Sequence, residues 1–234
     1  MLNNIESLLP AITGTLLVSI LAITMATPIG IIISIFISEY ASKFTKKTLL
    51  FFFKVLSSMP SILIGLTGFI IILSLNTIFN LKLRTSLILS AFSLSILILP
   101  YIVNTTSISL SNIPNSLRLS TISLGAKKHH SILYVLLPEI RGGILHGTIL
   151  ALARAVEDTA VIMLTGVAAF SGYPTSLLSS FEALPFFIYY KSAEYSNQQE
   201  LDQVLMAIII LVIINISLIF FADIIFKNKK EQNG

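Results

Sequence analysis

The chain has 234 residues, of which 55% are hydrophobic and 11% charged, and its formal net charge is +4. Water-soluble domains carry about 25% charged residues, so this composition excludes an ordinary soluble protein and indicates an integral membrane protein. The chain contains no cysteine, which excludes disulfides, thiolate catalysis and Cys-ligated metals. No hydrophilic stretch is long enough for a second domain, so residues 1–234 are predicted to form a single transmembrane domain.

Several charge-free windows are long enough to cross about 30 Å of hydrocarbon, which takes about 20 helical residues. They lie between Glu6 and Glu39, between Lys54 and Lys82 with a helix ending near Leu75, from Arg84 to about Thr106, from Gly142 to about Gly166, and from Leu205 to Phe226. Backbone polar groups must be satisfied internally in a bilayer, so we predict an all-α membrane protein with five to six transmembrane helices. The N-terminal window lacks the positive region of a secretory signal and is expected to be retained. Pro28 and Gly30 predict a kink or tilt in it.

Lysine and arginine lie mostly on one side of these predicted spans. If the segment between the third and fourth spans is cytoplasmic, the cytoplasmic side carries Lys43, Lys46, Lys47, Lys54, Arg118, Lys127, Lys128, Arg141, Lys227, Lys229 and Lys230. The outer side then carries only Lys82, Arg84 and Lys191. This bias predicts an outside N-terminus, a cytoplasmic C-terminus, a cytoplasmic loop over about 112–139 and an outward loop over about 167–204.

The predicted cytoplasmic loop contains a helix–glycine–helix–proline pattern. Pro114 suits the first turn of a short helix, and Asn112 is a candidate cap for it. Gly125 supplies the turn that ends this helix, and a second helix over residues 128–137 is expected to stop at Pro138. The pattern fits a docking surface for a partner, and its basic side chains also fit a loop held against anionic lipid headgroups.

The spacing from Gly125 over nine residues to Val135-x-Leu137-Pro138 resembles the cytoplasmic EAA loop of ABC importer permeases. In that family the loop docks into a groove on the ATPase subunit and transmits its closure to the membrane. The family's Glu-Ala-Ala corresponds here to Leu119, Ser120 and Thr121, so the acidic anchor is missing and basic side chains are its candidate substitutes. The resemblance thus implies ATPase coupling by Arg118, Leu119, Ser120, Thr121, Gly125, Lys127, Lys128, Leu137 and Pro138.

Other segments narrow the resemblance to the permeases of phosphate importers, and to their A-type (PstA) subunit, over residues 10–228. The segments are PIGIIISIFISEYAS, MPSILIGLTG, LALARAVEDTA and SSFEALPFFIYYKSAEY, followed by a last helix with Asn215. The resemblance implies a type I importer (MetI-like) core and an inner-membrane location. It also implies a homologous C-type permease, two ATPase subunits and an extracytoplasmic phosphate-binding protein as partners. ATP and magnesium are expected on the ATPase, no cofactor on this chain, and membrane lipid but no nucleic acid around it.

The fourth predicted span carries Arg154, Glu157 and Asp158 in its interior. Arg154 lies twelve residues after Gly142, which places it about 18 Å along a helix, where a charge costs about 2.5–3.5 kcal/mol on insertion scales. The two acids follow it by three and four residues and share its face. One interpretation is an ion pair that cancels its own cost, and the other is a stepping stone for an anion, since a guanidinium matches phosphate oxygens.

Glu157 departs from the phosphate permeases, which have a small residue before the acid that Asp158 matches. An extra carboxylate repels phosphate unless it is paired or turned away, so tungstate, molybdate and sulfate stay open as alternative substrates. Gly143 and Gly147 form a small-xxx-small pattern typical of close helix packing.

Two other classes of membrane protein fit the sequence less well than a permease. An intramembrane enzyme would need a motif such as H-E-x-x-H or G-x-S-x-G, and neither occurs. His129 and His130 are adjacent and point in different directions on a helix, so no metal site is predicted. An ATP-independent channel has no need of the helix–glycine–helix loop. The chain also lacks the G-x-x-x-x-G-K-[ST] phosphate loop, so the energy for transport is expected to come from another subunit.

Overall fold

The computed structural model describes residues 2–80 and 82–232, and side chains within residues 6–224. Helices dominate this part of the chain, as predicted, and only an isolated bridge between Val167 and Phe181 has β pairing. The helices are α1 (Leu2–Ile35), α2 (Lys43–Ser58), α3 (Ser61–Phe79), α4 (Leu87–Ser111), α5 (Asn115–Ser123), α6 (Lys128–Ser131), α7 (Leu137–Glu139), α8 (Arg141–Glu157), α9 (Ala160–Thr165), α10 (Leu184–Glu194) and α11 (Gln198–Gln232). Two π-helical turns, η1 (Phe36–Tyr40) and η2 (Ile132–Leu136), interrupt this order.

Four helices in the described part are long and apolar enough to cross a membrane. They are Glu6–Tyr40, Ser61–Phe79, Leu87–Ser111 and Gln198–Ile224. The segment Lys128–Glu139 and the helix Arg141–Glu157 meet the same criterion only as a pair bent by 67°, which brings the total to five. Lys227, Lys229 and Lys230, which the sequence assigns to the cytoplasmic side, lie outside the residues whose side chains the structure describes.

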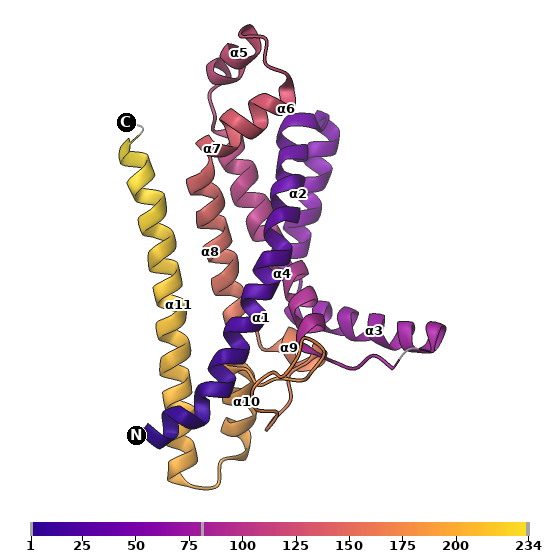
Figure 1. Ribbon diagram of the computed structural model, residues 1–234, viewed down its shortest axis with the longest axis vertical. Coiled ribbons are helices and arrows are strands. Elements are labelled where there is room, and N and C mark those ends of the chain that lie inside the picture. The colour runs from indigo at the N-terminus through magenta and orange to yellow at the C-terminus, as the bar shows by residue number, and fades with distance from the viewer. Residues whose placement is uncertain (1, 81, 233–234) are drawn as a thin grey trace.

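Helix α4 occupies the centre of the bundle between α1, α2 and α8 (Figure 1). The core on its surface includes Ala22 and Ala26 of α1, Leu94 and Ile98 of α4, and Ala155 of α8. Small residues allow α1 to approach α4 closely, because a side chain at Gly30 would overlap Ile102. Helix α1 continues through Pro28, and the buried Ser34 hydroxyl lies 3.2 Å from the Val103 carbonyl of α4.

The second predicted window contains the last residues of α2 and the whole of α3, which is long and apolar enough to span a membrane. Lys54 belongs to α2, which Ser42 caps by accepting a hydrogen bond from the Thr45 N–H at 3.2 Å. The chain turns at Met59, which is extended because a residue before proline is disfavoured in the helical region. Helix α3 then runs across the long axis of the bundle (Figure 1) and ends at Phe79, past the predicted end near Leu75.

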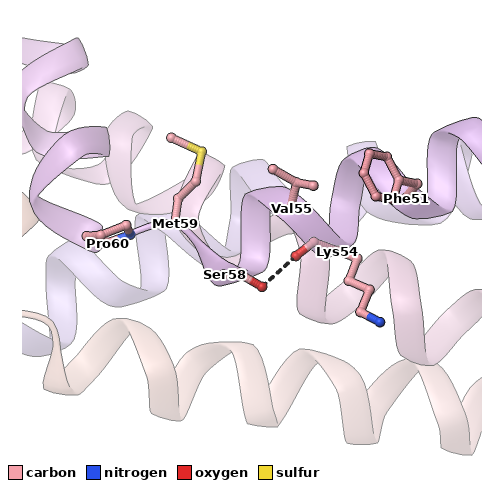
Figure 2. Close-up of a pocket in the computed structure, with 6 residues that line it drawn as sticks. All are labelled: Phe51, Lys54, Val55, Ser58, Met59 and Pro60. Carbon is pink, nitrogen blue, oxygen red and sulfur yellow. Dashed lines mark hydrogen bonds between the residues drawn. The ribbon is translucent and has the colours of Figure 1, made fainter.

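A groove of about 430 Å³ lies at the turn between α2 and α3. Figure 2 shows its lining, in which the Ser58 hydroxyl donates to the Lys54 carbonyl at 2.9 Å. The full set of lining residues is Phe51, Lys54, Val55, Ser58, Met59 and Pro60. Sequence patterns did not indicate this groove, because it is created by the change in direction at Met59.

The predicted outward loop contains α10 and packs against the first half of α1. A second core joins Leu8 and Ala11 of α1, Leu184 and Phe187 of α10, and Ala207 of α11. The Leu184 N–H donates to the Thr15 hydroxyl at 2.8 Å. This end of the molecule is therefore a folded layer that ties α10 to both terminal helices (Figure 1).

Candidate functional site: an arginine–carboxylate cluster and a helix–glycine–helix loop

Two glycines bring α8 into close contact with the central helix α4. A side chain at Gly143 would overlap Ser109, and one at Gly147 would overlap Thr105. Both glycines are buried. The hydroxyls of Thr105 and Ser109 donate to backbone carbonyls of their own helix. The close approach fixes the axis of α8 and thereby the position of the charged residues at its end.

Arg154 lies in the last turn of α8 and contacts both carboxylates that follow it. Its Nη2 lies 2.9 Å from Asp158 Oδ2, and its Nη1 lies 3.4 Å from Glu157 Oε1. The Arg154 side chain is 26% exposed and that of Asp158 only 2%. The short contact is therefore made with a buried carboxylate, whereas part of the arginine side chain remains exposed.

The fourth predicted span is not a continuous helix to Gly166, because α8 ends at Glu157. Asp158 is extended, with ψ of 122°, and its Oδ1 accepts a hydrogen bond from the Val161 N–H at 2.9 Å. Its two carboxylate oxygens thus serve different groups, one the start of α9 and the other Arg154. An acid that caps the next helix is a local reason for the break.

Glu157 is paired across the bundle with Asn215 of α11. The Asn215 amide Nδ2 donates to Glu157 Oε2 at 2.8 Å, while Glu157 Oε1 faces Arg154. A second polar contact joins the same two helices, where His146 Nε2 lies 3.7 Å from Asp223 Oδ1. Sequence reasoning did not assign Asn215 to the site, although a polar amide within an apolar span is a signal for a polar partner.

The loop after α4 contains the predicted helix, glycine turn and second helical segment. Gly125 has φ of +79°, and no atom lies within 4 Å of the position that a side chain would take. The hydroxyls of Thr121 and Ser131 lie 2.7 Å apart and join the two arms of the loop. Apolar side chains on the outer surface of this loop are exposed, namely Leu119, Ile122, Leu124, Leu133 and Tyr134.

Two local details of the loop differ from the predictions. Asn112 is the last residue of the α4 end rather than the cap of α5, which begins after Pro114 without a side-chain cap. The second helical segment passes through Pro138 and ends at Glu139. A π turn directly before the proline, in which the Leu137 N–H bonds to the Ile132 carbonyl, accommodates the missing proline N–H.

Leu137 and Pro138 lie at the junction between the loop and α8, on the bent pair of segments described above. Leu137 packs against a buried cluster beneath the loop, which comprises Leu110, Ile113, Ile132, Leu136 and Ile140. This cluster joins the end of α4, the loop and the start of α8. Packed side chains therefore connect the loop to both helices.

The basic residues of the loop have different surroundings. Arg118 forms an ion pair with Glu39 at the end of α1 and donates to the Leu110 carbonyl at 2.6 Å. Lys128 donates to the backbone carbonyl of Glu39. Lys127 is exposed. Two of the three basic side chains proposed as substitutes for an acidic anchor thus face the chain's own first helix, which the sequence did not reveal.

No group of three or more His, Cys, Asp or Glu side chains in the described residues could hold a metal ion. The charged residues that the sequence singled out lie in two areas, which are the cluster of Arg154, Glu157 and Asp158 and the helix–glycine–helix loop. They lie at opposite ends of α8.

Comparisons with known proteins show which sequences and folds this chain resembles. The family model described as "Binding-protein-dependent transport system inner membrane component" matches residues 26–231. The phosphate transport system permease protein PstA of Pasteurella multocida is 37% identical over 162 residues, which are 68% of this chain and 55% of that protein. PstA of Haemophilus influenzae is 29% identical over 232 residues, 97% of this chain and 78% of the relative. A PstA homolog of Mycoplasma pneumoniae is 33% identical over 170 residues, which are 71% of this chain. The chain spans 26% of the M. pneumoniae protein and about half of other relatives that it matches.

Solved structures share the fold. A chain of the MetNI methionine ABC transporter, described as inward facing, superimposes with a TM-score of 0.70 at 17% identity and covers 95% of both chains. A chain of an amino acid ABC transporter has a TM-score of 0.67 at 14% identity, covering 97% of this chain and 96% of that one. At this identity the likeness shows the fold alone, and it confirms the predicted MetI-like core.

Proposed function

We propose, from the premise that the chain belongs to the family of binding-protein-dependent transport system inner membrane components, that it is a permease subunit of an ATP-driven importer of inorganic phosphate. In this proposal it forms half of the translocation pathway. It is a transport subunit and not an enzyme, because ATP and magnesium bind to a separate ATPase. The PstA relatives support phosphate as the substrate.

The observation that carries the proposal is the arrangement of Arg154. Its guanidinium is held at 2.9 Å by a buried carboxylate of the same chain, while its side chain remains 26% exposed. A guanidinium presents several donors in a fixed plane and binds tetrahedral oxyanions bidentately. An entering phosphate can therefore share Arg154 with Asp158, and the residue returns to the carboxylate when the anion leaves.

Glu157 supports keeping a second oxyanion as the alternative substrate. Its side chain is 46% exposed beside Arg154, so its negative charge opposes an approaching anion. The Asn215 amide donates to one of its oxygens, which reduces but does not cancel this repulsion. Tungstate, molybdate or sulfate would meet the same pair of groups, so the competition among oxyanions decides between them and phosphate.

The helix–glycine–helix loop is proposed to bind the ATPase subunit. Leu119, Ile122 and Leu124 are exposed on its outer surface at 62%, 59% and 87%, and apolar side chains at the centre of an interface contribute much of its affinity. Gly125, Ser120 and Thr121 shape this surface, and Leu137 and Pro138 join it to α8. A homologous permease, a second ATPase subunit and an extracytoplasmic phosphate-binding protein complete the proposed assembly.

The distribution of basic residues gives the proposed orientation. Residues 112–139 lie in the cytoplasm with the C-terminus, and residues 167–204 face outward with the N-terminus. Maleimide labelling of single cysteines at Ser123 and Ser196 in intact cells tests this directly, since the chain has no native cysteine. Labelling at residue 123 by an impermeant reagent would show that the orientation is the opposite of the one proposed.

Uptake of radiolabelled phosphate by proteoliposomes tests the substrate and the source of energy together. The complex of this chain with its permease, ATPase and binding-protein partners is supplied with ATP on the ATPase side. Excess sulfate, molybdate or tungstate is added as competitor. We expect ATP-dependent phosphate uptake that resists all three anions.

The other outcomes of this experiment are equally specific. Inhibition by tungstate or molybdate would retain the permease and assign the chain to another oxyanion, with Glu157 as the first residue to replace. Absence of ATP-dependent uptake of any of these anions would reject the importer and reduce Arg154 and Asp158 to a structural ion pair.

A further inference from the structure

Ile35 at the end of α1 packs against the apolar cluster beneath the helix–glycine–helix loop, and the polar contacts to the loop come from the short segment Ser38–Tyr40 that follows. The carboxylate of Glu39 pairs with the Arg118 guanidinium, and the Ser38 hydroxyl donates to the same carboxylate at 3.2 Å. Lys128 donates to the Glu39 carbonyl, and its ammonium lies 4.5 Å from the centre of the Tyr40 ring. Side chain, backbone and aromatic ring of one segment thus hold both arms of the loop.

Helix α1 is not adjacent to this loop in the sequence, because α2, α3 and α4 lie between them. Helix α5 follows α4 directly, and the loop leads through α7 into α8, whereas Glu39 and Arg118 are 79 positions apart. Arg118 also donates to the Leu110 carbonyl at 2.6 Å, so a single guanidinium joins α1, α4 and α5. These polar contacts supply the link to α1 that the chain itself lacks.

A π turn at the end of α1 supports this geometry. In η1 the Ala41 N–H bonds to the Phe36 carbonyl at 2.9 Å, five residues back, and Ala41 is extended. The helix therefore ends directly after the segment that holds the loop, and π turns are frequent at functional positions. Ile37, in the same turn, is fully buried against Phe53 and Val103, so the segment is anchored to α2 and α4.

We propose that Glu39 is a positioning residue that fastens the loop to α1, so that displacement of the loop by the ATPase moves α1 together with α4 and α8. This inference rests on the proposed role of the loop in coupling. It reassigns Arg118 and Lys128, which serve this internal contact and leave Lys127 and the exposed apolar side chains to meet the ATPase.

The burial of the pair determines which substitutions are informative. The Glu39 side chain is 9% exposed and that of Arg118 is 22% exposed, so replacing one partner leaves the other charge poorly compensated. Removing one member of such a pair is more disruptive than exchanging both. The informative set is Glu39→Gln, Glu39→Arg, Arg118→Glu and the double exchange of Glu39→Arg with Arg118→Glu.

The assembled complex in proteoliposomes is the system for this test, with phosphate uptake and ATP hydrolysis measured on the same preparation. We expect each single substitution to lower the phosphate transported per ATP by about tenfold, the effect of losing one charge-assisted hydrogen bond, with the ATPase still bound. The double exchange should recover most of this ratio. Lys47→Gln, which neutralises an exposed lysine of α2, is the matched control and should equal the wild type.

A second measurement does not depend on phosphate being the substrate. Nitroxide labels at Ile32 of α1 and Ser123 of α5, both exposed, report their separation by pulsed electron resonance with and without ATP and vanadate. If α1 moves with the loop, the separation stays constant in the wild type and changes on adding nucleotide in Glu39→Gln. Failure of phosphate uptake in the wild type would reject the substrate and leave this readout valid.

Two results of the transport measurement, and one of the distance measurement, would overturn the inference. One is a transport ratio in Glu39→Gln equal to that of the wild type. The other is a double exchange no better than the worse single substitution, because a specific contact between the two charges predicts rescue. A nucleotide-dependent change of the label separation already present in the wild type would also show that α1 does not follow the loop.

Discussion

The two arginine sites of this chain are built in opposite ways. Arg154 pairs with carboxylates three and four residues further along, at 3.4 and 2.9 Å. Arg118 pairs with Glu39, 79 positions earlier in the chain. The first contacts join residues close in sequence at the end of α8, and the second exists only because α1 packs beside the loop. The comparison teaches that a charge motif among near neighbours is visible in a sequence, whereas a charge pair that joins two distant helices is not.

The difference in construction predicts a difference in what each site controls. The partners of Arg154 are its near neighbours in sequence, at the junction of α8 and α9, and part of its side chain is exposed, so this site suits the binding of a ligand. The partner of Arg118 belongs to a different helix, so that pair responds to relative motion. Substitutions at the two sites should therefore separate transport from coupling.

Arg154→Gln is expected to have the largest effect. Phosphate uptake should fall by about 10- to 150-fold, because a charge-assisted hydrogen bond to the anion contributes about 1.5–3 kcal/mol and every 1.4 kcal/mol is a factor of ten. Assembly with the ATPase, measured by copurification, should be unchanged. Arg154→Lys keeps the charge without the planar fork and should be intermediate. Normal uptake in Arg154→Gln would make this site structural and end the contrast with Arg118.

Gly125→Val tests the loop without touching any charge. A side chain at this position meets no atom within 4 Å, so the only cost is the backbone, at φ of +79°. That cost is about 1–2 kcal/mol for an L-residue, and coupling of uptake to ATP hydrolysis should fall by about tenfold. Gly125→Asn is the matched control, because asparagine adopts this conformation more readily. Equal coupling ratios in the two variants would show that the turn is not part of the coupling pathway.

Asp158 offers the smallest and most local test. Asp158→Asn keeps an oxygen for the Val161 N–H and loses the charge opposite Arg154, whereas Asp158→Ala loses both. Loss of a helix cap costs about 1 kcal/mol, so Asp158→Ala should unfold at a lower temperature than Asp158→Asn, measured by circular dichroism in detergent. The same transition temperature for both would mean that Asp158 does not stabilise the start of α9.

Most of the helical content was predictable because apolar runs and their interruptions determine it. The windows around α1, α4 and α11 needed only length and hydropathy, and the loop needed Pro114, Gly125 and Pro138. The predictions failed where a proline or an acid changed the chain direction. The turn at Met59, before α3 begins, was not predicted, and Asp158 ended α8 before Gly166.

The candidate site was predictable to the same degree. The spacing of Arg154, Glu157 and Asp158 predicted a shared face, and the structure brings the three side chains together. The sequence did not predict that Asn215 contacts Glu157 or that Glu39 contacts Arg118. Nothing in the spacing of distant residues indicates which helices will be neighbours. These contacts exist because α11 packs beside α8 and the end of α1 lies beside the loop.

The sequence by itself determined the class of molecule, the approximate spans, the loop and the local charge cluster, since each depends on residues within about twenty positions of one another. The tertiary structure alone decided that Arg118 and Lys128 turn inward to Glu39, that Glu157 is held by Asn215, and that α3 leaves the bundle axis. These features depend on side-chain packing between distant segments, in which small residues such as Gly30, Gly143 and Gly147 set how closely the helices approach.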